Sequence, residues 1–296
     1  MTTARIFDKL AIFGVGLIGG SVALALKRAG QTGTIVGVGR HHDAMQEALH
    51  LGVIDQTASA AEAAKDADLI LLATPVGQFP AILQTIAPHL KSTAVITDAG
   101  STKGDVVAAA RTNLGEFLPR FVPAHPIAGA EKSGVLAAKA ELFDSKKVVL
   151  TPLPETDPDA TAKAEAFWRA CGARVSDMTV ETHDRIFAAV SHLPHVLAFA
   201  LVEDIACRPN ADQLFGFAAG GFRDFSRIAG SSPEMWRDIC LANRDAMLQE
   251  LDAYATQLAQ IRSLIDSNDG VELAKLFEHA RNARSAWADA QQKQKK

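Results

Sequence analysis

Cysteine is scarce in this chain: only three of its 296 residues are cysteines, at positions 171, 207 and 240. They are odd in number and far apart, and none belongs to a CxxC pair. The sequence therefore lacks both a disulfide framework and the thiolate pairs of a structural zinc site. This is typical of a reduced, cytoplasmic protein.

A strong excess of charge is also missing, because the net charge is only −4 at pH 7 and no basic patch dominates. Nucleic acid is therefore not an expected partner. The first ten residues do not have the pattern of a signal peptide, and the apolar run over residues 10–26 is short and broken by four glycines. We expect a buried strand, turn and helix there, and no membrane partner.

Hydrophobic residues make up 48% of the chain, enough for a sizeable core in one or two domains. In the first half, helical patterns alternate with short apolar runs at 10–13, 34–38, 69–73, 94–98, 121–123 and 148–151. This alternation predicts a mostly parallel sheet covered on both faces. We predict a Rossmann-like α/β domain over residues 1–178, followed by an all-α domain over residues 179–296.

The second half is helical throughout. Apolar spacing predicts one long helix over residues 179–207, kinked at Pro194. Residues 231–234, SSPE, mark the start of another helix that would run to about Ser267, and Asp269 would begin the last one. The apolar faces of these helices are too large to be buried within one small domain. We therefore predict a homodimer formed through this domain.

Residues 14–19 read GVGLIG, a GxGxxG fingerprint between a predicted strand and a predicted helix. Gly14 would permit the tight turn, Gly16 would let the backbone approach a pyrophosphate, and Gly19 would let helix and strand pack closely. Leu17 and Ile18 would open the helix whose amino terminus faces the phosphates. The segment predicts a dinucleotide-binding site.

The end of the second predicted strand indicates which dinucleotide is bound. NAD enzymes usually carry an acidic residue there, but this chain has Gly39 followed by Arg40. An acid would repel a 2′-phosphate, whereas a glycine with an adjacent arginine accommodates one. We therefore favour NADP over NAD. The alternative is that Arg40 is a solvated surface residue and that either cofactor serves.

His125 stands between Pro123 and Pro126, where a strand ends. Strand carboxyl ends face the ligand crevice in open α/β sheets, so this histidine could accept a proton during hydride transfer. Alternatively, it is a loop histidine that caps a backbone group. Ser101 follows another strand and could reach the same pocket, or it could cap the next helix.

Arginines and histidines of the helical half are candidate substrate ligands. Arg223 and Arg227 lie in a glycine-containing segment that would suit an anionic substrate, although a salt-bridged turn is equally compatible. His192 and His195 are three residues apart, but no cysteine or carboxylate stands at matching spacing. We expect no metal site.

Several strings occur together in a characteristic order: GVGLIGGS, LLATPV, DAGSTK, HPIAGAEKSG, THDRIFAAVSHLPH and GFRDFSRIAGSSPEMWRDI. With them the chain resembles the prephenate/arogenate (cyclohexadienyl) dehydrogenases of tyrosine biosynthesis. The resemblance implies an oxidative decarboxylation of prephenate to 4-hydroxyphenylpyruvate or of arogenate to tyrosine. A hydride passes to NAD(P)+ and the ring carboxylate leaves as CO2.

The resemblance also implies roles for residues at the matching positions. His125 would take the proton of the ring 4-hydroxyl, Ser101 would orient both groups, and Arg227 would bind a substrate carboxylate. His195 would line the substrate pocket.

At the remaining matching positions, Glu131 and Asp184 would position or gate polar groups in that pocket. Thr74 and Pro75 of LLATPV would contact the cofactor.

Two other classes share parts of this pattern. β-Hydroxyacid and imine reductases have the same two-domain plan, but they usually rely on a lysine or aspartate in the long helix, where this chain has His192 and His195. A dinucleotide-binding sensor or scaffold would not need His125, Ser101 and Arg227 together. The choice between prephenate and arogenate stays open, because they differ only at a side-chain keto or amino group.

Overall fold

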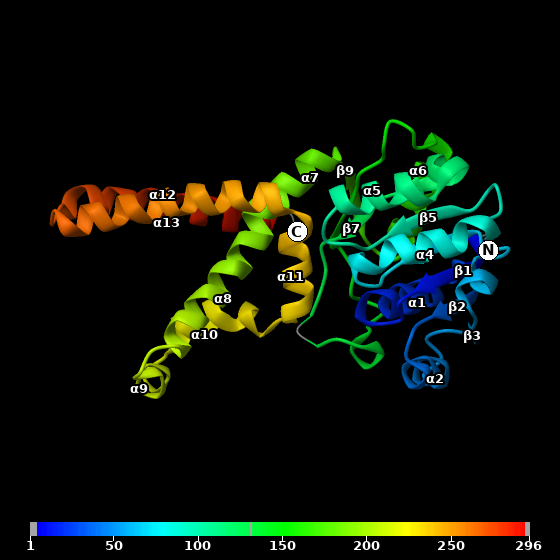
Figure 1. Cartoon of the computed structure of the whole chain (residues 1–296), viewed down its shortest axis with the longest axis horizontal. Coiled ribbons are helices and arrows are strands. Elements are labelled where there is room, and N and C mark those ends of the chain that lie inside the picture. Colours follow the sequence, from blue (N-terminus) through cyan, green and yellow to red (C-terminus); the bar gives the residue numbers. More distant parts are fainter. Residues whose placement is uncertain (1–4, 131, 294–296) are drawn as a thin grey trace. The chain divides into compact units, whose positions relative to one another are not determined.

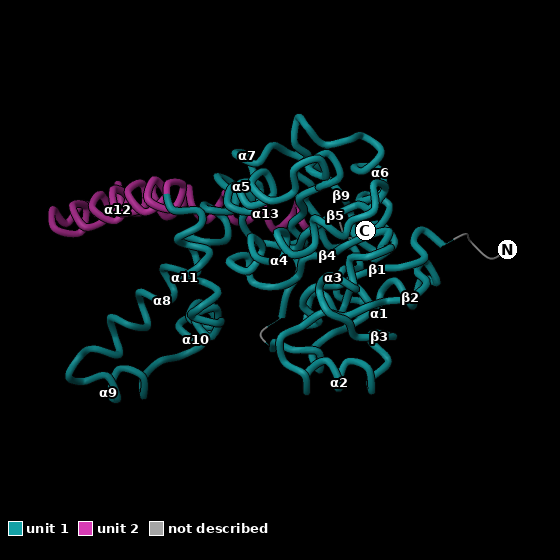
Figure 2. The backbone as a smooth tube through the Cα atoms, turned by 45° about the vertical axis from the view of Figure 1, so that its right-hand side comes forward, with its two compact units in different colours: residues 1–244 teal, residues 245–296 magenta. Residues whose placement is uncertain are grey.

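The computed structural model describes residues 5–130 and 132–293. The chain forms two compact units, residues 1–244 and residues 245–296 (Figure 2). The first unit holds every strand and the helices α1 to α11. The second consists of the helices α12 (Arg244–Asp266, whose first residue belongs to the first unit) and α13 (Gly270–Lys293).

Six parallel strands form the main sheet in the order β3-β2-β1-β4-β5-β6 (Figure 1). Their bounds are Phe7–Phe13 (β1), Thr32–Val38 (β2), Gln56–Thr57 (β3), Leu69–Leu72 (β4), Val95–Asp98 (β5) and Phe121–Val122 (β6). The prediction of a parallel sheet is thus confirmed. The strand order reverses between β1 and β4, and ligands of such sheets bind outside the carboxyl ends of the strands at this switch point.

The apolar run at 148–151 does not belong to this sheet, so that prediction was wrong. It forms β8 (Lys147–Leu150) in a second sheet, between β7 (Ala124–Pro126) and β9 (Arg174–Asp177). β7 is antiparallel to β8, and β9 is parallel to β8. Pro123 stands between β6 and β7 and has no N–H group to continue the first ladder, while its carbonyl accepts Thr151 N in the second.

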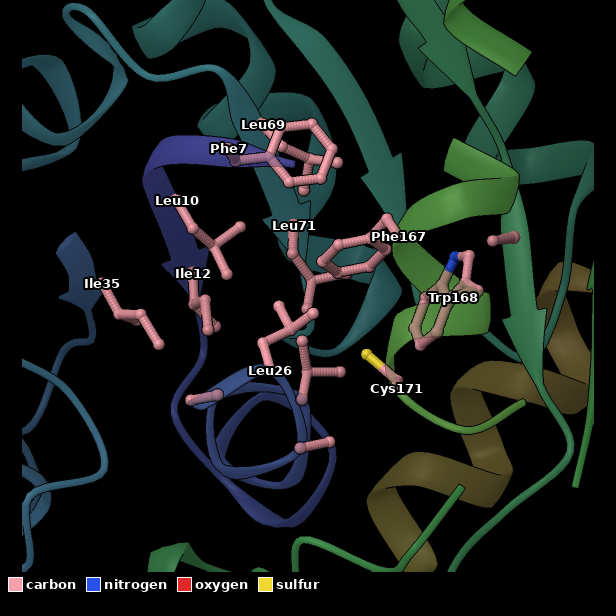
Figure 3. Close-up of a cluster of buried hydrophobic side chains, with 14 of the residues drawn as sticks. Phe7, Leu10, Ile12, Leu26, Ile35, Leu69, Leu71, Phe167, Trp168 and Cys171 are labelled. Atoms are coloured by element: carbon pink, nitrogen blue, oxygen red, sulfur yellow. The ribbon is translucent and has the colours of Figure 1, made fainter. Parts of the chain in front are cut away.

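Helices cover both faces of the main sheet. On one face, α1 (Leu17–Ala29) and α6 (Pro158–Ala170) pack on alternate side chains of β1 and β4, among them Leu10, Ile12 and Leu71 (Figure 3). On the other face lie α3 (Ala60–Ala64), α4 (Phe79–Ile86) and α5 (Gly104–Asn113). Burial on both faces explains why the strands read as unbroken apolar runs. The helix α2 (His42–His50) follows β2.

The long helix predicted over residues 179–207 is confirmed as a continuous helical segment. It consists of α7 (Val180–Phe187), a π-helical turn over residues 188–192, and α8 (Leu193–Ala206). Thr179 caps it by accepting the N–H of Thr182. The π turn ends two residues before Pro194, which has no N–H group for a regular helical ladder.

By length and composition, the segment Val180–Ala206 is apolar enough to cross a membrane, with a mean hydropathy of 1.6 over its best window, 28% of which is buried in the protein.

The chain then forms α9 (Ala211–Gly216), α10 (Gly220–Ser226) and α11 (Pro233–Ala242). Ser232 caps α11 by accepting Met235 N, which confirms the helix start predicted there. The expected continuation to Ser267 was wrong, because α11 ends at Ala242. Asn243 leaves the helical conformation (φ −103°, ψ 35°), and its side-chain N–H donates to the carbonyl of Asp184.

Candidate active site

The glycine turn after β1 has no room for side chains at two of its positions. Gly14 has a φ of 94°, and a Cβ on it would lie 2.7 Å from the carbonyl oxygen of Ala73. A Cβ on Gly19 would lie 2.1 Å from the carbonyl oxygen of Gly14. A Cβ on Gly16, in contrast, would meet nothing within 4 Å. The backbone is therefore packed tightly against β4 and α1 but is open at Gly16.

This open position lies at the N-terminus of a helix, where the free N–H groups and the helix dipole favour a bound anion. Gly16 is the N-cap of α1 and has no side chain to accept the first N–H groups of the helix, which include those of Leu17 and Ile18. Thr74 follows β4 on the same side, since its backbone N would lie 2.9 Å from a Cβ on Gly14, and Pro75 comes next. These residues fit a dinucleotide whose pyrophosphate approaches the helix N-terminus.

Arg40 lies at a surface pocket beside this turn. The pocket is lined by Gly37, Gly39, Arg40, His42, Met45, Thr57 and Ala58. A Cβ on Gly39 would lie 2.8 Å from the sulfur of Met45, so the thioether occupies the place next to the glycine. The pocket thus presents an exposed guanidinium and contains no carboxylate among its lining residues.

His125 lies in the middle of β7, only 9% exposed, three residues beyond the end of β6. Its Nδ1 is 2.8 Å from Nε2 of His183 on α7, and its ring packs at 4.7 Å on that of Phe187. Burial, and next the positive charge of Lys103, hold the pKa of His125 well below its ordinary value of 6.5. The imidazole is therefore neutral near pH 7 and able to accept a proton.

His183 is in turn hydrogen-bonded to Asp184. Its Nδ1 is 2.8 Å from Oδ1 of the carboxylate. The same carboxylate accepts the backbone N–H groups of Lys103 (2.9 Å) and Gly104 (2.8 Å), at the beginning of α5. Asp184, which lies on α7, therefore caps α5. It links α5, which precedes His125 in the chain, to α7, which follows it.

An ion pair between Asp98 and Lys103 lies beneath this site, with both side chains fully buried. The Lys103 ammonium also donates to the carbonyl of Ala124 (2.8 Å), while the Asp98 carboxylate accepts the N–H groups of Ala124 (2.9 Å) and Gly100 (2.7 Å). The pair thereby fixes the backbone immediately before His125. Burial raises the pKa of Asp98, and the Lys103 ammonium opposes that shift.

A second group of aromatic and polar side chains lies around the start of α8. It consists of His192 in the π turn, His195 on α8 and Trp236 on α11. The His195 ring stacks on Trp236 at 3.7 Å and has its Nδ1 2.9 Å from the Ser191 carbonyl. Burial lowers the pKa of His195, and the positive charge of the exposed Arg227 lowers it further. The helical turn Arg227–Gly230 contacts α8, the helix that carries His195. His192 is fully buried, and burial lowers its pKa to about 4.

Two buried polar atoms of this group have no hydrogen-bond partner within the described residues: Nε2 of His192 and Nε1 of Trp236. The His192 Nδ1 lies 3.3 Å from the amide of Asn243. Buried polar atoms of a native protein are normally satisfied by protein, water or ligand. The group therefore has spare hydrogen-bonding capacity.

The structure places the remaining predicted residues as follows. Ser101 is half-buried in the loop between β5 and α5, and neither it nor Thr102 caps α5, whose first N–H groups go to Asp184. Glu131 lies outside the described residues. Over residues 5–130 and 132–293, no cluster of three His, Cys, Asp or Glu side chains is arranged to hold a metal ion.

Sequence reasoning missed four residues of this site: His183, Asp98, Lys103 and Trp236. All four stand inside strings already quoted, because DAGSTK contains Asp98 and Lys103, THDRIFAAVSHLPH contains His183, and GFRDFSRIAGSSPEMWRDI contains Trp236. Asp98 and Lys103 stand five residues apart between a strand and a helix, and the structure buries both side chains. Nothing local, however, distinguishes them from a solvated pair.

Comparison with known proteins gives a consistent result over most of the chain. Residues 22–177 match the family model of the prephenate dehydrogenase nucleotide-binding domain, and residues 179–279 match that of the prephenate dehydrogenase dimerization domain. The chain is similar to the prephenate dehydrogenase of Bacillus subtilis, with 39% identity over 94% of this chain and 75% of that protein.

Two solved structures are similar to the fold as a whole. Prephenate dehydrogenase from Aquifex aeolicus, in complex with hydroxyphenyl propionate and NAD+, has 37% identity and a TM-score of 0.89 over 94% of this chain and 98% of that one. Arogenate dehydrogenase from Synechocystis has 30% identity and a TM-score of 0.80 over 94% of this chain and 99% of that one.

Proposed function

This chain belongs to the prephenate dehydrogenase family, and on that premise we propose that it oxidatively decarboxylates prephenate to 4-hydroxyphenylpyruvate, arogenate to tyrosine, or both, in tyrosine biosynthesis. The bound nicotinamide of NAD(P)+ supplies the hydride acceptor. The residues of the chain position the substrate and hold the hydroxyl proton during the reaction. The observation that carries the proposal is the neutral, buried His125 next to the carboxyl end of the sheet that bears the glycine turn.

His125 serves as the proton acceptor. Loss of a hydride from ring C4 leaves positive charge on the carbon that bears the hydroxyl, and transfer of the hydroxyl proton to His125 converts this centre into a ring carbonyl. As CO2 leaves, the electron pair of the broken C–C bond passes through the ring to that oxygen, which takes the proton back from His125 to give the phenol. A neutral imidazole within hydrogen-bonding reach of the hydroxyl can accept that proton. Ser101, in the loop after β5, is proposed to orient the hydroxyl.

Arg227 and His195 are the proposed substrate ligands on the helical side. Prephenate carries two carboxylates and needs a cationic anchor, and a guanidinium can bind a carboxylate with two parallel hydrogen bonds. The contact between α8 and the helical turn that begins at Arg227 supports their presence in one pocket. Glu131 remains a predicted pocket residue, and Asp184 acts through its protein neighbours, because both of its oxygens accept protein N–H groups.

The direct experiment measures initial rates of reduced-cofactor formation with prephenate and with arogenate, each combined with NAD and with NADP. Turnover in at least one combination is expected, and the four rates together identify the substrate and the cofactor. Lack of turnover in all four, with the cofactor still binding in a fluorescence titration, would overturn the proposed function.

For the cofactor, we propose that the enzyme prefers NADP, with Gly14, Gly16, Leu17, Ile18, Gly19, Thr74 and Pro75 at the dinucleotide and Arg40 at the 2′-phosphate. The support is the pocket at Arg40, in which Gly39 replaces the acid that would bind a ribose 2′-hydroxyl.

Arg40→Ala is expected to lower kcat/KM for NADP by about tenfold or more, because it removes a hydrogen bond to a charged group. The value for NAD should change less than about threefold, since NAD has no phosphate at this place. The matched control is Arg111→Ala, which removes an exposed arginine paired with Glu155 on another part of the surface. An unchanged ratio of NADP to NAD efficiency in Arg40→Ala would contradict the assignment.

We also propose a domain boundary between residues 178 and 179. Residues 1–178 form the dinucleotide-binding domain, and residues 179–296 form a helical domain for substrate binding and dimerisation. The helical part exposes many large apolar side chains, among them Val190 (67%), Phe217 (84%) and Leu241 (67%) in the first unit and Ile265 (61%) and Trp287 (58%) in the second. Exposed apolar surface of this kind is typical of an interface. A second copy of the chain is the proposed cover.

Light scattering in solution is therefore expected to give a mass of two chains, that is about twice 31.4 kDa. The mass should hold across a dilution series because the apolar faces stabilise the dimer. A mass of one chain at every concentration would rule out the dimer.

The cysteines agree with a cytoplasmic location, which is the one we propose. Cys171, Cys207 and Cys240 are all unpaired thiols. Unpaired cysteines are typical of proteins that work in a reducing compartment.

A further inference from the structure

We infer that His183 and Asp184 act as a positioning pair that fixes the tautomer of His125, so that the lone pair available to the substrate lies on Nε2. The inference rests on the proposed role of His125 as proton acceptor and extends it to two residues behind the ring. It assigns them a task in the reaction, in addition to joining α7 to α5.

The chain of hydrogen bonds begins at the carboxylate of Asp184. Its two oxygens accept the N–H groups of Lys103 and Gly104 in the first turn of α5, where the helix dipole also favours a negative charge. Burial raises the pKa of Asp184, but the hydrogen bonds from His183, Gly104 and Lys103 outweigh it and hold that pKa below its ordinary value of 3.8. Asp184 is therefore an anion, and an anion can only accept hydrogen bonds.

The direction of every further bond follows from this. Since Asp184 accepts, Nδ1 of His183 must donate at 2.8 Å, and a neutral His183 then has its lone pair on Nε2. This lone pair faces Nδ1 of His125 at 2.8 Å, so that Nδ1 must be the donor. A neutral His125 that is protonated on Nδ1 carries its own lone pair on Nε2.

Packing holds both rings in this arrangement. Phe187, one turn after His183 on α7, contacts the His125 ring at 4.7 Å and the His183 ring at 4.5 Å. The His183 side chain is fully buried, so water does not compete for its nitrogens. Among the described residues, the other charged or titratable groups around the two rings are Lys103, which is paired with Asp98, and His192.

The arrangement also serves the step after proton transfer. The O–H bond of the substrate breaks, an N–H bond forms on Nε2, and His125 becomes an imidazolium that keeps its Nδ1–H bond to His183. The nearby Lys103 ammonium disfavours this cation, whereas the Asp184 carboxylate, acting through the polarisable His183 ring, favours it. The pair thus stabilises the charged form of the base in a buried place.

The first test is the tautomer of His125 in the wild-type enzyme without substrate, read from long-range ¹H–¹⁵N correlation spectra of protein with labelled histidine. His125→Asn identifies the His125 signals by their disappearance. We expect a proton on Nδ1 and an unprotonated Nε2 near pH 7. A His125 protonated on Nε2 would overturn the inference, and this outcome does not depend on which substrate the enzyme turns over.

The second test compares two substitutions of His183. Glutamine can place an amide oxygen near the position of Nε2 and keep an acceptor for His125, whereas phenylalanine keeps the ring volume and removes the acceptor. We expect His183→Phe to lower kcat by about 10²-fold or more and to shift His125 towards the Nε2-protonated tautomer, and His183→Gln to retain at least about tenfold more activity than His183→Phe.

The same comparison separates this inference from the proposed function. His50→Phe, at an exposed histidine on α2, controls for the substitution itself. Equal kcat values in the two His183 variants, with KM and melting temperature matched, would show that His183 has a structural role only. If wild-type enzyme turned over neither substrate but had the expected tautomer, the proposed function would fail, while the assignment of the His125 tautomer to the His183–Asp184 pair would stand.

Discussion

His125→Asn is expected to lower kcat by about 10²- to 10⁴-fold, the range typical of losing a positioned general base. Asparagine can hydrogen-bond the substrate hydroxyl but cannot take up its proton. The glycine turn at residues 14–19 and the Arg40 pocket do not include His125, so cofactor affinity should stay within a few-fold of the wild type.

The pH profile should identify the same residue. The active form of His125 is neutral, and its pKa lies well below 6.5 because burial and the Lys103 charge disfavour the imidazolium. The kcat/KM of the wild type should therefore stay high as the pH falls through 6.5 and decline only at lower pH. The residual activity of His125→Asn should lack this decline.

His89→Asn provides the control for this substitution, because His89 is an exposed histidine after α4, away from the site. It should leave kcat and the pH profile unchanged. Turnover by His125→Asn within a few-fold of the wild type would show that another group accepts the proton.

Lys103→Met should have the largest effect on stability, about 3–5 kcal/mol in the free energy of unfolding. Methionine is similar in length, so the cost comes from leaving the Asp98 carboxylate unpaired in a place where both side chains are fully buried. The variant also loses the hydrogen bond to the Ala124 carbonyl, which adjoins His125. Urea unfolding at one fixed protein concentration measures the change.

The matched control is the same substitution in an ion pair nearer the surface. Lys91 pairs with Asp68, and the two side chains are 34% and 28% exposed. Water can solvate Asp68 when its partner is removed, so Lys91→Met should cost about 1 kcal/mol or less. Adding Asp98→Asn to Lys103→Met should recover part of the loss, since the neutral amide needs no counter-ion. Equal losses in Lys103→Met and Lys91→Met would contradict the account of the buried pair.

Local patterns in the sequence were enough to predict much of the fold. Strands of a doubly covered parallel sheet need unbroken apolar runs, and a tight turn between strand and helix needs glycine where φ is positive, as at Gly14. Helix starts such as the one at Ser232 depend on a side chain and an N–H group three residues away. All of these features are encoded within a few neighbouring residues.

The two misplaced elements depend on partners outside the local pattern. The run at 148–151 has the composition of a buried strand in either sheet, and it joins the second sheet through its pairing with β7. The long helix expected after Ser232 ends at Ala242, where Asn243 donates to the Asp184 carbonyl, 59 residues away. Neither partner can be recognised from the segment itself.

The features of the active site also fall into those that local sequence encodes and those that depend on distant partners. The sequence by itself determined which chemical groups are present: a glycine turn between a strand and a helix, an arginine next to the glycine that stands where an acid is usual, and a histidine a few residues after a strand. Only the tertiary structure decided that His125 contacts His183, 58 residues away, and that Asp184 caps α5 across 81 residues. The physical reason is that local sequence sets backbone preferences and buried faces, whereas hydrogen bonds and pKa values of buried groups depend on which distant segments the topology brings together.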